Sequence, residues 1–150
     1  MALYEAKIKT PKTLEEAFDY VVDLRNLTEW DPGVSVANLT SDTPIALGST
    51  FYVSANGANI HYEIETYERP QSFSFCGKTR FFLSEDKISF EQVDGDNIVT
   101  YFARLDLNGP ASIFDKLLAK KFKGICDSGG AGLAKALDGE IVESGLVTSD

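Results

Sequence analysis

The chain has 150 residues, of which 43% are hydrophobic and 25% charged, with a formal net charge of −9; these values are typical of one globular domain with a substantial core. The excess of acidic groups would repel a phosphate backbone, which argues against nucleic acid as a partner. The sequence contains neither an apolar run long enough for a transmembrane helix nor the pattern of a signal peptide, so we expect a cytoplasmic protein.

Residues 2–9 alternate between apolar and polar side chains, which predicts a half-buried strand. Thr13 is followed three residues later by Glu16, the spacing of a capping box at the start of a helix. The apolar residues that follow fall on one helical face. Asp23 can cap a second short helix that runs to about Trp30.

The next seventy residues predict a succession of strands. Asn56-Gly57 and Asp94-Gly95 are dipeptides typical of tight hairpins, and tight turns between successive strands predict an antiparallel meander. One face of each strand is more apolar than the other, so we expect one face of the sheet to be covered. The expected strands are 34–40, 49–55, 58–68, 72–78, 80–93 and 98–107, with a bulge or turn at Ser84-Glu85-Asp86.

The segment Pro110–Leu137 is the longest helical pattern in the chain and carries four glycines in its second half. Glycine inside a helix costs about 0.5–1 kcal/mol relative to alanine, so we predict a bend or break between Gly124 and Gly132 that opens a pocket. A straight helix packed tightly on its neighbours is the alternative. Residues 140–150 lack periodicity, and we expect a loosely ordered tail after a single domain at 1–139.

Three spaced patterns accompany this order of elements. They read D-x-x-N-x-x-x-W-x-P-x-V at 23–34, G-x-x-F at 48–51 and Y-x-I-x-x-x-E-x-P-x-x-F at 62–73. Over residues 2–138 the chain resembles the START-related (helix-grip) superfamily, in its polyketide cyclase/dehydrase-like branch. The resemblance implies an α+β helix-grip fold, in which a curved antiparallel sheet wraps around a long C-terminal helix and two short helices follow the first strand. It also implies a cup for a hydrophobic ligand.

Signs of catalysis are few. His61 is the only histidine, and alternation places it on the solvent face of its strand together with Glu63 and Glu65. A zinc site needs three or four ligands, and one histidine with the distant Cys76 and Cys126 does not supply them. We therefore predict no metal, no cofactor and no assigned catalytic residue, and we expect both cysteines to be reduced, buried apolar groups.

Tyr62 and Tyr101 are the polar groups that alternation points into the cup, where a hydroxyl can orient a ligand. Trp30 is expected at the rim. The predicted ligand-binding residues are Trp30, Phe51, Tyr62, Phe75, Phe90, Tyr101, Phe114, Leu118, Ile125 and Gly129.

We favour binding or transport of a small hydrophobic ligand, such as a lipid, isoprenoid or aromatic polyketide, between the sheet and the C-terminal helix. One alternative is an enzyme of the polyketide cyclase/dehydratase kind, with Tyr62 or Tyr101 as acid or base. The other is an interaction module with a filled core that regulates a partner protein. A cavity would separate the third hypothesis from the first two, and convergent polar groups with shifted pKa values would favour the enzyme. The sequence does not indicate an oligomeric state.

Overall fold

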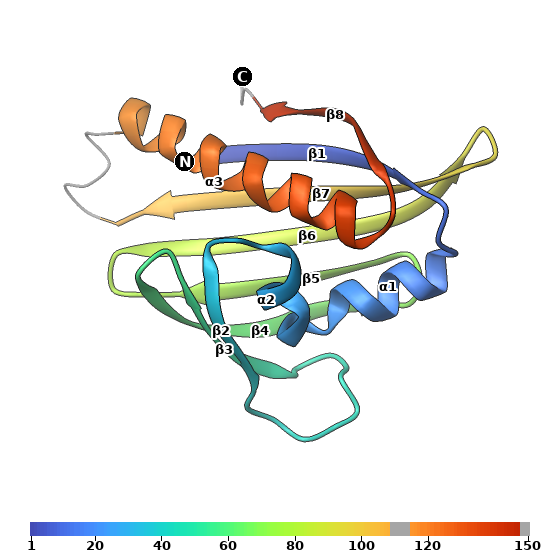
Figure 1. Ribbon diagram of the computed structural model, residues 1–150. Coiled ribbons are helices and arrows are strands. Elements are labelled where there is room, and N and C mark those ends of the chain that lie inside the picture. The colour runs from blue at the N-terminus through green and yellow to red at the C-terminus, as the bar shows by residue number, and fades with distance from the viewer. Residues whose placement is uncertain (109–114, 148–150) are drawn as a thin grey trace.

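The computed structural model describes residues 1–108 and 115–147. Eight strands form one antiparallel sheet in the order β2-β3-β4-β5-β6-β7-β1-β8 (Figure 1). The strands are β1 (Ala2–Thr10), β2 (Val34–Leu39), β3 (Thr50–Ala55), β4 (Ala58–Glu68), β5 (Ser72–Lys78), β6 (Phe82–Val93), β7 (Asp96–Leu107) and β8 (Glu140–Leu146). The helices are α1 (Leu14–Val22), a 3-10 turn at Leu24–Asn26, α2 (Leu27–Trp30) and α3 (Asp115–Ala136).

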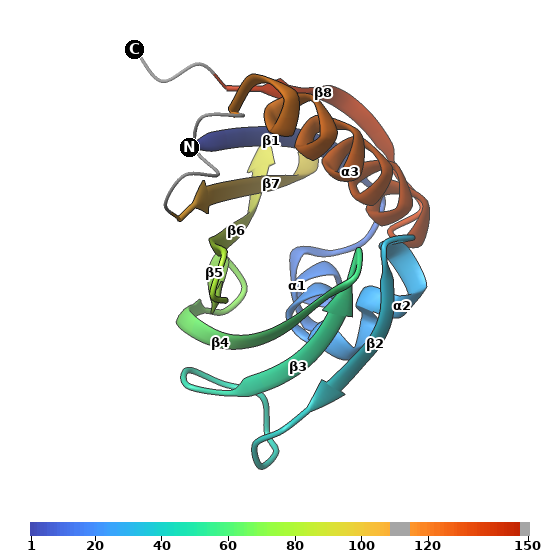
Figure 2. The ribbon, with the colours of Figure 1, turned by 90° about the vertical axis from the view of Figure 1, so that its left-hand side faces the viewer.

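The sheet curves strongly, and the helices lie on its concave side (Figure 2). α3 packs near β1 and β8, α2 packs against β2, and α1 lies on the concave face beside β6. This arrangement confirms the predicted helix-grip fold. It leaves the interior between α3 and the middle of the sheet as the place where a ligand could lie.

The local signals in the sequence explain most element boundaries. The Thr13 hydroxyl accepts a hydrogen bond from the Glu16 backbone N–H at 3.1 Å, which confirms Thr13 as the N-cap of α1, and it donates one to the Glu16 carboxylate at 3.0 Å. Asn56-Gly57 and Asp94-Gly95 each have positive φ at both residues, as tight hairpins require.

The segment Ser84-Glu85-Asp86 differs from its prediction. We expected a bulge or turn there, but the pairing of β6 with β5 and with β7 runs through these residues without a shift of register. The three residues are therefore ordinary strand positions, and Asp86 is directly opposite Phe75 on β5 and Ala103 on β7. A charged residue thus occupies a central strand of the sheet.

α3 is one uninterrupted helix, so the predicted bend or break between Gly124 and Gly132 is wrong. The glycines serve close packing instead. A Cβ atom at Gly132 would overlap the backbone carbonyl oxygen of Trp30, and one at Gly130 would lie 3.6 Å from the Cβ of Ala6. The second half of α3 therefore passes directly over the end of α2 and over β1. Gly124 differs, since a Cβ there would meet no atom within 4 Å.

The residues expected to form a loosely ordered tail form β8 instead. This strand pairs antiparallel with β1, whose other edge pairs with β7. Its side chains are mostly exposed, so it lacks the alternation that a buried face would impose. The segment is ordered because its backbone pairs with the free edge of β1. Backbone pairing does not require a hydrophobic pattern, so the sequence gives no sign of this strand. The last three residues lie outside the described residues.

Candidate ligand-binding site

A cavity of about 240 Å³ lies between the curved sheet and α3. For comparison, a dry apolar cavity of roughly 150 Å³ binds benzene, and pockets for drug-sized ligands start at about 300 Å³. The space therefore suits a compact ligand. Side chains from β3 to β7, from α3 and from the segment after α2 form its wall, including Val53, Ile60, Phe75, Ala103, Phe122 and Ile125.

Four of the predicted ligand-binding residues line this cavity: Tyr62, Phe75, Tyr101 and Ile125. They come from β4, β5, β7 and α3, so the fold brings together residues that are far apart in the sequence. The alternation that points Tyr62 and Tyr101 inward is confirmed. These four residues define the part of the site that could be predicted from the sequence alone.

The other predicted ligand-binding residues have different places. Phe51 and Phe90 are buried in the core, where the ring of Phe90 packs 5.3 Å from that of Phe18. Leu118 lies beside Leu105 and Leu107, in a separate small space. Phe114 falls outside the described residues.

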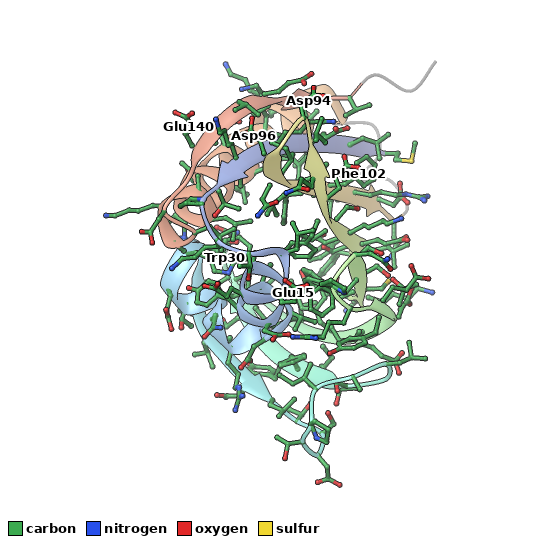
Figure 3. The ribbon with its side chains drawn as sticks, turned by 90° about the vertical axis from the view of Figure 1, so that its right-hand side faces the viewer. Glu15, Trp30, Asp94, Asp96, Phe102 and Glu140 are labelled. Carbon is green, nitrogen blue, oxygen red and sulfur yellow. The ribbon has the colours of Figure 1, made fainter. Side chains whose placement is uncertain are left out.

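Trp30 and Gly129 belong to the packing beneath α3. Trp30, labelled in Figure 3, is 3% exposed and lies in the interior. A Cβ atom at Gly129 would be 3.9 Å from its ring. The expectation that Trp30 forms the rim is therefore wrong. Its backbone supports α3 because Gly132 allows the two chains to approach closely.

The polar end of the cavity centres on Asp86, a residue that the sequence analysis did not identify as part of a site. Its carboxylate accepts a hydrogen bond of 2.6 Å from the Tyr101 hydroxyl, and the residue is only 7% exposed. The hydroxyls of Tyr62 and Ser84 share a hydrogen bond of 3.2 Å beside it. Three strands thus aim polar groups at one end of an otherwise mostly apolar space.

Burial raises the pKa of Asp86 to about 7, although the hydrogen bond from Tyr101 acts in the opposite direction, and the nearby Asp31 raises it further. Burial and the charge of Asp86 raise the pKa values of Tyr62 and Tyr101 above the ordinary range. Both tyrosines therefore stay protonated and act as hydrogen-bond donors. The group whose charge changes near neutral pH is the carboxyl of Asp86.

Asp31 brings a second carboxylate to the same cavity. It follows α2, and its Oδ1 accepts a hydrogen bond of 2.9 Å from the Gly33 backbone N–H. Burial raises the pKa of Asp31, with that hydrogen bond acting against it. Cys126 on α3 also lines the cavity, and burial raises the pKa of its thiol, so it stays neutral and is a poor nucleophile.

The cavity opens beside α3. Asp31, Asn56, Lys121 and Ile125 line both the cavity and an adjoining depression at the surface. This mouth lies between α3 and the turn that joins β3 to β4. Gly124 lines the surface depression and leaves it unobstructed.

A larger cleft, of about 540 Å³, lies at the end of the molecule where Asp94, Asp96 and Glu140 are labelled in Figure 3. Its lining includes the ion pair between Lys9 and Asp96, with a separation of 3.5 Å. The cleft is wide and polar, so it lacks the apolar wall that a hydrophobic ligand needs. We therefore assign the candidate site to the smaller cavity beneath α3.

Other groups considered in the sequence lie away from the cavity. His61 is exposed and its ring packs 5.4 Å from that of Tyr52, while Glu63 and Glu65 are exposed on the same face of the sheet. Within residues 1–108 and 115–147, no three His, Cys, Asp or Glu side chains are grouped to hold a metal ion. The helices of this part of the chain include none that is long and apolar enough to span a membrane.

A curved antiparallel sheet around a long helix, with a cavity between them, defines a helix-grip protein of the START-like class. The family described as polyketide cyclase / dehydrase and lipid transport matches residues 1–138, and the chain belongs to this family. The resemblance seen in the sequence is thereby confirmed. A comparison with the curated proteins gave no match.

Solved structures share the fold at low sequence identity. A START superfamily protein from Mycobacterium smegmatis has a TM-score of 0.70 at 10% identity, over 92% of this chain and 98% of that one. The hypothetical protein jhp0584 from Helicobacter pylori has 0.71 at 13%, over 89% and 87%. The protein TTHA0849 from Thermus thermophilus has 0.69 at 17%, over 90% and 96%. At these identities the likeness extends to the fold alone.

Proposed function

We propose that the protein binds a compact hydrophobic ligand in the cavity beneath α3, with one polar group of the ligand at Asp86 and Tyr101. The observation that carries this proposal is the concave, largely apolar space with polar side chains converging at one end. Membership of a family described as polyketide cyclase / dehydrase and lipid transport supports it. The same cavity argues against an interaction module with a filled core.

The volume narrows the ligand class. About 240 Å³ exceeds the roughly 150 Å³ that accommodates one benzene ring, so a body of one or two rings fits. A long acyl chain would exceed this space, so among the predicted ligands we favour a small aromatic or cyclic compound. Each methylene it buries would contribute roughly 0.8 kcal/mol to binding. The free thiols of Cys76 and Cys126 fit a reducing compartment, and we place this binding in the cytoplasm.

Filling the mouth of the cavity should abolish binding. We expect Ile125→Trp to weaken the binding of the neutral probe 2-phenylethanol at least tenfold, because Ile125 lines both the cavity and its mouth. Leu117→Trp is the matched control, since Leu117 is on the same helix, is 71% exposed and does not line the cavity. Both variants can be titrated by NMR, following the backbone amides of Tyr101 and Cys126. Equal affinities in the two variants would rule out this cavity as the binding site.

An acid–base enzyme is the second candidate, because the Asp86 carboxyl has a pKa of about 7 and touches a tyrosine hydroxyl. The raised pKa values of Tyr62 and Tyr101 make them donors, so proton exchange would fall to Asp86 and not to a tyrosine. For dehydration of an aromatic β-hydroxyketone, with Asp86 as base, kcat should rise with pH through about 7. Asp86→Asn should remove at least 99% of the rate, and Tyr101→Phe should remove less. A rate that Asp86→Asn leaves unchanged would exclude this candidate.

A further inference from the structure

The cavity places two carboxylates in a mostly apolar space. Of the described residues that line it, the Asp, Glu, Lys and Arg side chains are Asp31, Asp86 and Lys121. Lys121 is exposed at the mouth, whereas Asp86 is buried at the inner end and Asp31 is half-buried. The inner end of the cavity is therefore negative once Asp86 loses its proton.

The groups that surround Asp86 add no positive charge. Tyr101 on β7 donates to its carboxylate, and Tyr62 on β4 and Cys126 on α3 line the same space as neutral groups. Asp31 approaches from the segment after α2 and Glu85 precedes Asp86 in the chain, and both raise the pKa of Asp86 through their negative charge. The ionised Asp86 carboxylate has the Tyr101 and Ser84 hydroxyls as donors but no cation, so in apolar surroundings its charge is only partly compensated.

The aromatic side chains of the cavity also favour a cation. Tyr62 and Phe75 pack edge to face with ring centroids 5.0 Å apart, and Tyr101 adds a third aromatic ring to the wall. The faces of such rings carry negative potential and attract ammonium groups. Carboxylates and rings together make a site that would repel an anionic ligand.

From this arrangement we infer that the ligand carries a protonated amine on its compact apolar body, with the ammonium group bound to Asp86 and within the field of Asp31. The inference rests on the proposed function, because the apolar body must occupy the cavity. A cationic ligand excludes fatty acids and other anionic lipids, because their negatively charged head groups would be repelled by two carboxylates. A neutral ligand would place a hydroxyl or carbonyl group at the same polar end of the cavity, beside Asp86 and Tyr101, without forming an ion pair.

Three probes with one phenyl body test the inference: 2-phenylethylamine, 2-phenylethanol and 3-phenylpropionate, titrated calorimetrically at pH 8. We expect the amine to bind at least tenfold more tightly than the alcohol, and the carboxylate to bind most weakly. If the alcohol binds and the amine binds no more tightly, the inference is wrong while the proposed function stands. If none of the three binds, the proposed function itself fails.

Substitutions locate the charge that recognises the amine. Asp86→Asn keeps an oxygen that can accept the Tyr101 hydrogen bond, so its backbone amide NMR spectrum should match that of the wild type away from β6 and report an intact fold. The amine should lose at least tenfold in affinity, and Asp31→Asn should cause a smaller loss. Glu91→Gln, an exposed change on the same strand, should leave all three probes unaffected. Amine binding that survives both Asp86→Asn and Asp31→Asn would overturn the inference.

The pH dependence provides a second readout. Because the Asp86 carboxyl must lose its proton to attract the ammonium group, affinity for the amine should rise at least fivefold from pH 5.5 to pH 8. The alcohol should bind equally across this range. Near pH 6.5, binding of the amine should release protons, so its measured enthalpy should change with the ionisation enthalpy of the buffer. A flat profile for the amine in the wild-type protein would contradict the inference.

Discussion

Replacing Gly132 by alanine should destabilise the protein by on the order of 3 kcal/mol. The new methyl group would overlap the carbonyl oxygen of Trp30, so α3 or α2 would have to move away from its neighbour. Overpacking of a filled interior costs typically 1–3 kcal/mol and occasionally more, and here the obstacle is rigid backbone. Chemical denaturation at neutral pH measures the loss as a shift of the urea midpoint.

Gly124→Ala is the matched control on the same helix. A Cβ atom there meets nothing within 4 Å, so only the helix propensity changes. We expect a gain of about 0.5–1 kcal/mol, which is the difference between glycine and alanine in a helix interior. If the two substitutions shifted stability equally, close packing would not be the reason for the glycine at position 132.

Asp86→Asn should raise the free energy of unfolding at neutral pH, because it removes a carboxyl that is destabilising when it ionises inside the folded protein. The carboxyl has a pKa of about 7 in the folded protein, above the ordinary value of 3.8. Below pH 4 it is protonated in both the folded and the unfolded state, and its favourable contribution to stability is fully present. As pH rises from 4 to 7 the unfolded state loses this proton first, so the free energy of unfolding falls. The difference corresponds to roughly 4 kcal/mol at most. Between pH 4 and pH 8 the asparagine variant should therefore gain several kcal/mol relative to the wild type.

Urea denaturation of both proteins at several pH values measures this effect. The comparison cancels groups that are present in both proteins, such as Asp19 and Asp127, whose pKa values are lowered by Arg69 and Lys123 and which act in the opposite direction. Glu91→Gln should follow the wild type at every pH. Parallel stability curves for the wild type and Asp86→Asn would show that folding does not raise the pKa of Asp86.

The destabilisation caused by the buried Asp86 carboxylate bears on ligand binding. A ligand that binds only the folded state stabilises it by an amount that grows with the logarithm of its affinity, and a cation at Asp86 would offset the penalty that burial imposes on the carboxylate. The stability that Asp86→Asn is expected to gain and the amine affinity that it is expected to lose therefore have the same physical origin. Measuring both in one variant tests whether Asp86 is retained for function at the expense of stability.

The fold could be predicted because its signals are local. Thr13 with Glu16, the Asn56-Gly57 and Asp94-Gly95 turns and strict alternation in the strands each depend on a few neighbouring residues. Long-range packing was the part that could not be predicted. The sequence shows four glycines in α3, but it does not show that the carbonyl of Trp30 lies against one of them.

The candidate site was predicted in part for the same reason. Tyr62 and Tyr101 follow alternation, whereas the polarity of Ser84-Glu85-Asp86 suggested a turn. A usable signal was present, since Asp86 precedes the inward-facing Ile88 and Phe90 by two and four residues and so shares their face. A charged residue at an inward position of a strand, where burial shifts its pKa, is a candidate for a functional group.

The two halves of α3 have different roles, one in packing and one in lining the cavity. Its second half is held by contacts that tolerate no added atom at Gly132, and Asp127 is tied to β1 by the 2.7 Å hydrogen bond from the Tyr4 hydroxyl. Its first half presents Lys121 and Ile125 to the cavity and leaves open space at Gly124. Substitutions that change ligand preference can therefore accumulate in the first half at little cost to folding, which makes this segment the natural starting point for evolving or engineering a new specificity.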